Sequence, residues 1–246
     1  MRIIHISDLH IRGNNKDNAV VREKLAGILD MFTAGDVVVA TGDITDDGKE
    51  DQYAKAEVLL APFTGRLMLV PGNHDFGRLG NFYSADCVRR FATLRVALAA
   101  ETNWMFRVDG FPVGQIIGLD TCLRTGSIVD FAQGRVGFWQ RTRLRWKLDE
   151  MKKHRAVSVV ALHHNPYYTD WFCRLKDAKE FFEVVLGRAD IVLMGHEHKE
   201  RYTWYPSGLP EAQAQTRLYA AGALFREKTE PLVIQVVPPD RRGGSR

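Results

Sequence analysis

The feature that most restricts the fold is a series of short apolar runs that alternate with helical segments. DVVVATGD at 36–43 is rich in β-branched residues and ends in Gly-Asp, and RLMLVPG at 66–72 is a second run of this kind. Such runs predict strands that are buried on both faces, as in a parallel sheet covered by helices. The chain therefore opens in β-α-β-α-β order, with its first strand at 2–7. Apolar residues at helical spacing predict helices at 18–33, 49–61 and 84–100.

Two of the predicted helices have a clear apolar face. The helix predicted at 137–154 is basic, with Leu144, Leu148 and Met151 on its apolar side. In the helix at 18–33 the apolar face comprises Val21, Leu25, Ile28, Leu29 and Phe32. Each of the two patterns predicts a helix that covers a sheet.

The second half of the chain closes with three strand-like pieces that have no helices between them. A hairpin-like pair is predicted before them, at 104–110 and 114–121. We expect one α/β domain over residues 1–240, built around two packed sheets, and a flexible tail at 241–246. The remaining elements are predicted strands at 156–164 and 189–198 and a helix at 174–187.

Composition excludes several classes of protein. The 246 residues are 45% hydrophobic and 26% charged, which suits one large globular domain. The net charge of +4 only weakly favours phosphate-bearing partners. Three scattered cysteines without a CxxC pair argue against a disulfide framework or a zinc–thiolate site. The apolar part of the N-terminus is too short for a signal peptide, and no stretch has the length of a membrane helix. We therefore expect a soluble cytoplasmic protein that does not act at a membrane.

Metal-ligand residue types follow five of the predicted strands. Because the carboxyl ends of neighbouring strands meet at one crevice, these side chains should converge. They are carboxylates, imidazoles and one amide, a set without thiolate that suits Mn, Fe, Zn or Co. Residues two apart at a strand end project to the same side, so each Asp-x-His or His-x-His pair can bind one ion. The five motifs are Asp8-Leu9-His10, Gly42-Asp43, Gly72-Asn73-His74-Asp75, His163-His164 and Gly195-His196-Glu197-His198.

The order of these motifs is similar to that of the calcineurin-like metallophosphoesterase superfamily. That family has D-x-H, G-D, G-N-H-[DE], H and G-H-x-H, and all five occur here in order between Asp8 and His198. The resemblance covers most of the chain. It implies a four-layer αββα sandwich of two mixed β-sheets flanked by helices.

The resemblance also implies a site for two divalent ions, with Mn²⁺ or Fe expected first and Zn or Co as alternatives. A hydroxide between the ions would attack phosphorus in line. Asp43 would bridge the ions. Asp8, His10 and His198 would bind the first ion, and Asn73, His163 and His196 the second.

The resemblance gives His74 a catalytic role that does not involve an ion. It would stabilise a phosphoryl oxygen of the transition state or protonate the leaving oxygen. Asp75 has two readings: it could orient the His74 ring, or it could cap the turn. His164 could face the substrate or only flank His163.

Within the superfamily, the closest type is the class III cyclic nucleotide phosphodiesterase. HISDLHI, TGDITDDG, PGNHD and Gly-Leu-Asp-Thr at 118–121 carry this similarity. Protein Ser/Thr phosphatases continue the second motif with an Arg that is absent here, and repair nucleases typically have G-D-x-F-D, which Ile44-Thr45 does not match. Asn165-Pro166 departs from the His-His-Pro-Pro of many relatives, a difference that leaves the metal ligands intact and concerns the substrate contacts. We expect a phosphodiesterase that acts on a nucleotide-type or other small diester.

Several alternatives stay open. The basic helix at 137–154 could contact a nucleic-acid backbone in a nuclease, although a solvated helix face explains it more simply. A phosphomonoesterase and a non-catalytic scaffold are further alternatives, and a dimer is compatible with the resemblance. Arg12 could reach a phosphate or be a solvated loop charge. Tyr167, Tyr168, Trp171 and Phe172 could stack a nucleobase or serve in packing.

Overall fold

A computed structural model describes residues 1–78, 82–108, 111–124, 132–167 and 170–237. The predicted flexible tail at 241–246 lies outside these residues. The described chain forms two mixed sheets and a small two-stranded ladder, β4 (Gly77–Arg78) with β5 (Phe82–Tyr83). The first sheet has the order β12-β1-β2-β3, with β1 (Arg2–Ile6), β2 (Asp36–Thr41), β3 (Leu67–Val70) and β12 (Leu232–Gln235). The second has the order β10-β11-β9-β8-β7-β6, with β6 (Asn103–Val108), β7 (Phe111–Gly118), β8 (Val157–Ala161), β9 (Ile191–Met194), β10 (Arg201–Tyr205) and β11 (Thr216–Ala220).

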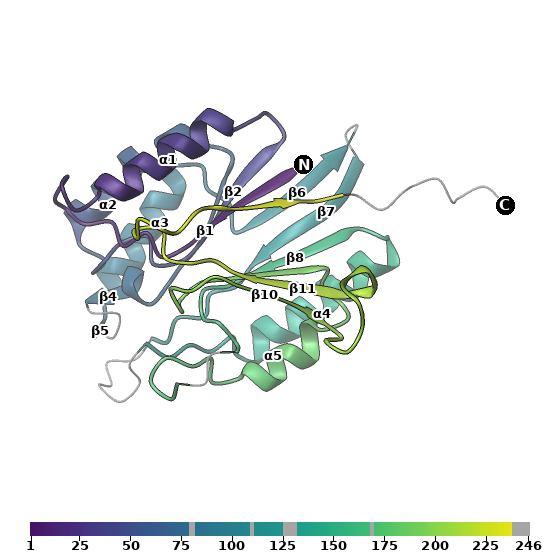
Figure 1. Cartoon of the computed structure of the whole chain (residues 1–246). Coiled ribbons are helices and arrows are strands. Elements are labelled where there is room, and N and C mark those ends of the chain that lie inside the picture. Colours follow the sequence, from purple (N-terminus) through teal and green to yellow (C-terminus); the bar gives the residue numbers. More distant parts are fainter. Residues whose placement is uncertain (79–81, 109–110, 125–131, 168–169, 238–246) are drawn as a thin grey trace.

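Helices cover the outer face of each sheet, and the two sheets pack against each other (Figure 1). This arrangement confirms the predicted four-layer αββα sandwich. The first sheet is covered by α1 (Ala19–Met31), α2 (Glu50–Leu60) and α3 (Ala85–Ala97), and the second by α4 (Phe138–Lys153) and α5 (Ala178–Val185). Single-turn 3₁₀ helices are η1 (Ala61–Phe63), η2 (His74–Phe76) and η4 (Glu211–Gln213).

The central strands are buried on both faces, which explains their continuous apolar sequences. In β2, Val38 and Ala40 pack beneath the helices, while Val37 and Val39 face the second sheet. Strands β1, β2 and β3 run parallel, as do β8, β9 and β11. The loops that follow these strands therefore leave the two sheets at their carboxyl ends, where the polar motifs lie.

One feature differs from the sequence prediction, and a second was left open by it. Leu29 was expected on the buried face of α1, but it is 44% exposed, because Val21, Leu25 and Ile28 already form the buried stripe. The three closing strands also divide between the sheets. Strands β10 and β11 join the second sheet, whereas β12 returns to pair antiparallel with β1.

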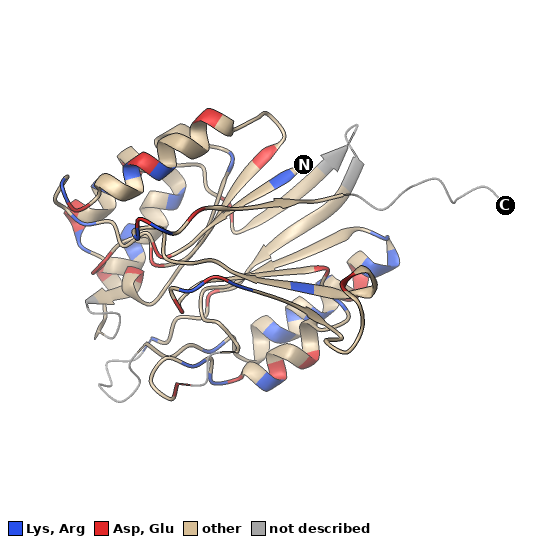
Figure 2. Ribbon diagram, viewed as in Figure 1, with Lys and Arg blue, Asp and Glu red and all other residues tan. Residues whose placement is uncertain are grey.

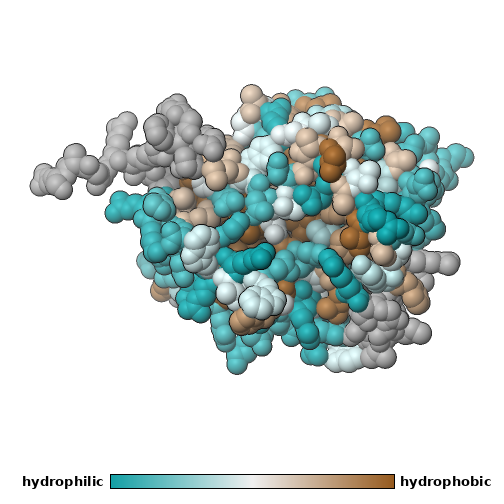
Figure 3. Space-filling view, turned by 180° about the vertical axis from the view of Figure 1, so that it is seen from behind, coloured by the Kyte–Doolittle hydropathy of each residue, from teal (hydrophilic) through white to brown (hydrophobic). Residues whose placement is uncertain are grey.

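The surface mixes charge and polarity. Acidic and basic residues both occur on the outer helices (Figure 2), and hydrophobic residues on the rear face lie among hydrophilic ones (Figure 3). On α4 and its neighbours, Arg141 pairs with Asp177, and Lys153 with Glu150. This pairing favours the solvated-face reading of the basic helix. No helix in the described ranges is both long and apolar enough to cross a membrane.

Candidate metal centre

The loops that follow five strands converge and bring the seven predicted ligands together. Two groups of ligand atoms form, each with its atoms within 4.8 Å of one another, and the two groups share Asp43. The Asn73 amide joins the second group, with Oδ1 3.1 Å from Nε2 of His163. The first group is Asp8, His10, Asp43 and His198, and the second is Asp43, His163 and His196.

Most of these ligands stand on strained backbone. Left-handed φ angles are uncommon outside glycine and cost about 1–2 kcal/mol per residue. Main-chain hydrogen bonds between loops, such as Asp8 N–H to the Gly42 carbonyl at 3.0 Å, hold this conformation in place. Strain concentrated in this way indicates a functional site. The φ values are 52° at Asp8, 45° at His10, 50° at Asp43, 73° at His196 and 56° at His198.

Glycine allows the loops to approach one another closely at the centre of the site. A Cβ at Gly72 would lie 2.2 Å from Oδ1 of Asp43, so a larger residue would displace the shared carboxylate. The same Oδ1 accepts a hydrogen bond from the main-chain N–H of His74 at 2.9 Å. The position of Asp43 is thus fixed by the Gly72–His74 turn.

The histidines of the second group are oriented to bind a cation. Nδ1 of His163 donates to the Thr41 carbonyl at 2.8 Å, and Nε2 of His196 donates to the Cys173 carbonyl at 3.0 Å. The remaining ring nitrogens, Nε2 of His163 and Nδ1 of His196, face each other at 3.1 Å. In neutral rings these atoms carry lone pairs that repel each other, and a cation between them would accept both.

The electrostatics of the site also fit divalent ions. Burial lowers the pKa of His163, but the charge and hydrogen bond of Asp43 raise it more, to about 9. The Asp43 carboxylate therefore favours positive charge at this position, which a bound cation would also supply. Burial raises the pKa of Asp8, but His198 and His163 offset this and bring it to about 2. Among the described residues, Oδ1 of Asp8 is buried without a well-formed hydrogen bond, and Nε2 of His198 lies 3.3 Å from it. A cation bound at this position would satisfy the oxygen.

His74 lies beside the first ligand group, and its ring is not held by Asp75. Nδ1 donates to the main-chain carbonyl of Asp46 at 2.7 Å. The Asp75 carboxylate instead accepts from the main-chain N–H groups of Gly72 and Thr45, both at 2.9 Å. Of the two readings of Asp75, these contacts favour the turn cap, and a role in orienting His74 stays a prediction. Burial and the nearby Asp43 raise the Asp75 pKa to about 6.

The predicted substrate contacts occupy different environments. His164 is fully buried, and its Nδ1 contacts Oγ1 of Thr121 at 2.7 Å. Arg12 has a 53% exposed side chain, and its Nε lies 3.2 Å from Oδ2 of Asp46. The Tyr167 ring packs 4.8 Å from the ring of Phe182 on α5.

The other aromatic residues of that loop are placed less deeply. Trp171 and Phe172 are 47% and 51% exposed. Tyr168 lies outside the described residues. Of the two readings of these aromatics, packing applies to Tyr167, while base stacking by Trp171 stays a prediction.

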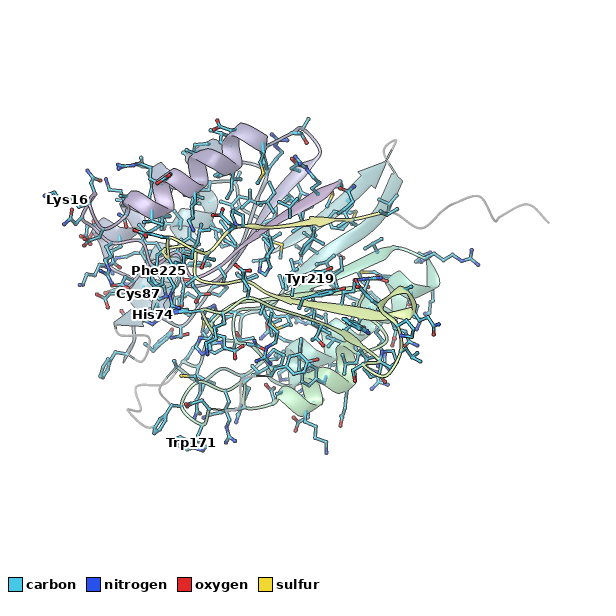
Figure 4. The ribbon with its side chains drawn as sticks, in the orientation of Figure 1. Lys16, His74, Cys87, Trp171, Tyr219 and Phe225 are labelled. Carbon is cyan, nitrogen blue, oxygen red and sulfur yellow. The ribbon has the colours of Figure 1, made fainter. Side chains whose placement is uncertain are left out.

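Sequence reasoning missed two residues of the site. Oδ1 of Asp46 lies 3.3 Å from Nδ1 of His10, and Asp46, His10 and His74 form a third group with ligand spacing. The clue in the sequence was the position of Asp46, three residues after Asp43. Phe225 packs its ring 5.2 Å from His10 and 5.5 Å from His198. It comes from the loop after β11, which carries none of the five motifs, and Figure 4 labels it on the same side of the molecule as His74.

Comparisons with known proteins agree with this geometry. The family model of calcineurin-like phosphoesterases matches residues 1–200. A probable cyclic nucleotide phosphodiesterase of Coxiella burnetii is 32% identical over 254 residues, which covers 93% of this chain and 90% of the relative. A probable glycerophosphodiester phosphodiesterase of Arcobacter nitrofigilis is 25% identical over 173 residues, which covers 68% of this chain and 57% of the relative. The structure of a dimetal phosphatase from Danio rerio has the same fold, with a TM-score of 0.66, 14% identity and coverage of 94% and 90%.

Proposed function

Because the chain belongs to the calcineurin-like phosphoesterase family and is a metal-dependent phosphoric ester hydrolase, we propose that it is a phosphodiesterase with two divalent ions. One observation carries this proposal: two groups of ligand atoms share a single carboxylate, that of Asp43. A shared carboxylate is how a protein holds two ions a few ångströms apart.

Each ligand group has a role in the proposal. Asp43, which belongs to both groups, would bind both ions through its carboxylate. The donors are oxygen and imidazole nitrogen only, which suits Mn²⁺ or Fe, with Zn or Co as alternatives. Asp8, His10 and His198 hold one ion, and Asn73, His163 and His196 hold the other.

When bound, the two ions supply an activated water nucleophile and positive charge for the phosphoryl oxygens. His74 acts on the substrate itself. Its Nδ1 is engaged by the Asp46 carbonyl, so Nε2 is the ring atom that can reach the substrate. A protonated ring would donate Nε2–H to the leaving oxygen, or to a phosphoryl oxygen as charge develops.

The proposed substrates are small diesters, either nucleotide-type or glycerol-type. The Coxiella burnetii and Arcobacter nitrofigilis relatives, named for these two classes, support this choice. A second candidate, a nuclease, is motivated by the exposed Arg143 and Arg145 on α4. Neutralisation of Arg141 and Lys153 by neighbouring carboxylates weighs against it.

Diester and monoester hydrolysis by the same protein tests the proposal. Metal-stripped protein is reloaded with Mn²⁺ and supplied with bis(p-nitrophenyl) phosphate or p-nitrophenyl phosphate. We expect faster turnover of the diester, and loss of turnover in Asp43→Asn but not in His154→Ala, which changes an exposed histidine after α4. A preference for the monoester would contradict the proposal. Cleavage of plain DNA at moderate salt would favour the nuclease.

A further inference from the structure

The loop between β11 and β12 places the positively charged side chain of Arg226 at the edge of the metal centre. Nη2 of Arg226 lies 3.5 Å from Nδ1 of His198. The other ring nitrogen of His198, Nε2, faces into the ligand group, 3.3 Å from Oδ1 of Asp8. Arg226 is therefore separated from the proposed ion by one imidazole ring.

The turn that carries Arg226 is anchored firmly. Its start is tied to the first motif, because the main-chain N–H of Leu224 donates to the Ser7 carbonyl at 3.0 Å. Lys24 on α1 donates to the carbonyls of Arg226 and Glu227, at 2.6 and 3.1 Å, and also to that of Thr229. A charged group that satisfies three carbonyls fixes the path of the turn.

The Arg226 side chain is exposed on this fixed turn, and its guanidinium lies 5.7 Å from the centre of the Phe225 ring. Within the described part of the chain it forms no ion pair with a carboxylate. Arg12, the arginine expected from the sequence to reach phosphate, is instead paired with Asp46 at 3.2 Å. Arg226 is thus the better placed of the two to meet an anion.

The contact between Arg226 and His198 is not compatible with an ion bound to His198. Arginine only donates hydrogen bonds, so Nδ1 of His198 must be the acceptor in this contact. A neutral imidazole that gives Nε2 to an ion carries its hydrogen on Nδ1, and that nitrogen can no longer accept. The exposed guanidinium could then turn to water or to an anion beside the ion.

We propose that Arg226 binds a phosphoryl oxygen of the substrate and is a specificity-determining residue of this site. This inference rests on the proposed function, because it assumes a phosphate ester beside the ions. The ligand class is a phosphate group with at least one anionic oxygen, which the planar guanidinium can bind through two N–H groups. The guanidinium lies beside His198 at the edge of the first ligand group, where such an oxygen would be within its reach.

Steady-state kinetics with bis(p-nitrophenyl) phosphate and Mn²⁺-loaded protein tests the proposal. Arg226→Ala should lower kcat/KM about 10- to 100-fold, mainly through KM, because a charge-assisted hydrogen bond is lost. Arg226→Lys should recover part of this loss, since lysine retains the positive charge but lacks the paired N–H donors of the guanidinium. The matched control is Lys228→Ala, an exposed cation on the same turn, which should stay within about twofold of the wild type.

Binding of inorganic phosphate to the Mn²⁺-loaded proteins, followed by calorimetry, separates this inference from the proposed function. Weaker phosphate binding by Arg226→Ala, with the same metal content as the wild type, would support the role of Arg226 even if no diester is hydrolysed. Equal phosphate affinity and equal KM in Arg226→Ala and Lys228→Ala would overturn it. Loss of manganese from Arg226→Ala would also overturn it, because Arg226 would then support His198 rather than the substrate.

Discussion

At the scale of single residues, the centre depends on side chains that are held by main-chain atoms of other loops. His74 is the clearest case, because the Asp46 carbonyl holds its Nδ1 and its own N–H holds the Asp43 carboxylate. A general acid in a fixed position contributes about 10²- to 10⁴-fold to a rate.

We therefore expect His74→Ala to lower kcat for the diester by at least about 100-fold while both ions are retained. Turnover and metal content per chain, measured on one preparation, check this. His154→Ala serves as the control and should behave like the wild type. Loss of one ion from His74→Ala would contradict the assignment, because it would place His74 among the ligands.

A second residue, Asp46, divides its roles between side chain and main chain. Its carboxylate contacts His10, whereas its carbonyl holds His74. Asp46→Ala removes the contacts of the carboxylate with His10 and Arg12 and leaves the carbonyl in place. We expect the affinity for Mn²⁺ to fall about 10- to 100-fold, as for other groups that orient a ligand.

Titration of metal-stripped Asp46→Ala with Mn²⁺ measures this effect. Because the carbonyl remains, kcat at saturating Mn²⁺ should fall less than the affinity does. Asp17→Ala, an exposed carboxylate in the preceding loop, is the control. A variant with normal affinity but greatly reduced kcat would show that the carboxylate acts elsewhere.

The sequence predicted which side chains converge at the site better than it predicted the contacts around them. Asp43 and His163 could be found because each follows a buried strand, and such strand ends must converge. The partners of His74 and Asp75 could not, since the local sequence does not say which of two adjacent loops supplies an acceptor. Phe225 could not be found either, because its place depends on how the chain returns after β11.

At the scale of elements, one buried ion pair ties the start of the first sheet together. Asp36 is 4% exposed and accepts from Nε and Nη2 of Arg2 on β1, at 3.0 and 2.6 Å. It also accepts from the main-chain N–H and hydroxyl of Thr33, at 2.7 and 2.9 Å. The Arg2 hydrogen bond is the largest cause that lowers the Asp36 pKa, to about 2.

This depressed pKa predicts a stability that depends on pH. The contribution of Asp36 is complete above the carboxyl pKa of the unfolded chain, about 4, and is lost as pH falls toward 2. Asp36→Asn should therefore lower the free energy of unfolding by about 2 kcal/mol at pH 7, and by much less near pH 2. Urea unfolding across this range measures the difference, with Asp30→Asn on the exposed face of α1 as control. An equal loss at pH 7 and pH 2 would rule out the ion pair as its source.

Element types were predictable because periodicity reports burial directly. The buried strand β2 and the helix α1 both lie where the apolar patterns indicated. Strand partners were not predictable in the same way. Strand β12 follows β11 in sequence but pairs with β1, which lies more than 200 residues earlier in the chain. Local sequence patterns carry no information about pairing at this separation.

At the scale of the whole molecule, the candidate centre joins the two sheets. Asp8, Asp43 and Asn73 follow strands of the first sheet, whereas His163, His196 and His198 follow strands of the second. Bound ions would therefore link the two halves of the sandwich and neutralise carboxylates that are fully buried between them.

We expect removal of the ions to destabilise the whole fold. A ligand present at about 1,000 times its Kd stabilises a protein by about 4 kcal/mol, which corresponds to roughly 10 °C in Tm for a chain of this size. Thermal unfolding before and after chelation measures the shift, and added Mn²⁺ should reverse it. Asp43→Asn should respond much less to Mn²⁺. A Tm that is insensitive to chelation would mean that the ions do not link the sheets.

The most direct test of the account is the number of ions needed for activity. Metal-stripped protein is titrated with Mn²⁺, and hydrolysis of bis(p-nitrophenyl) phosphate is measured together with the manganese bound per chain. The geometry of two ligand groups sharing Asp43 predicts that activity rises to a plateau at two ions per chain. Full activity with one ion, or turnover that persists without metal, would contradict it.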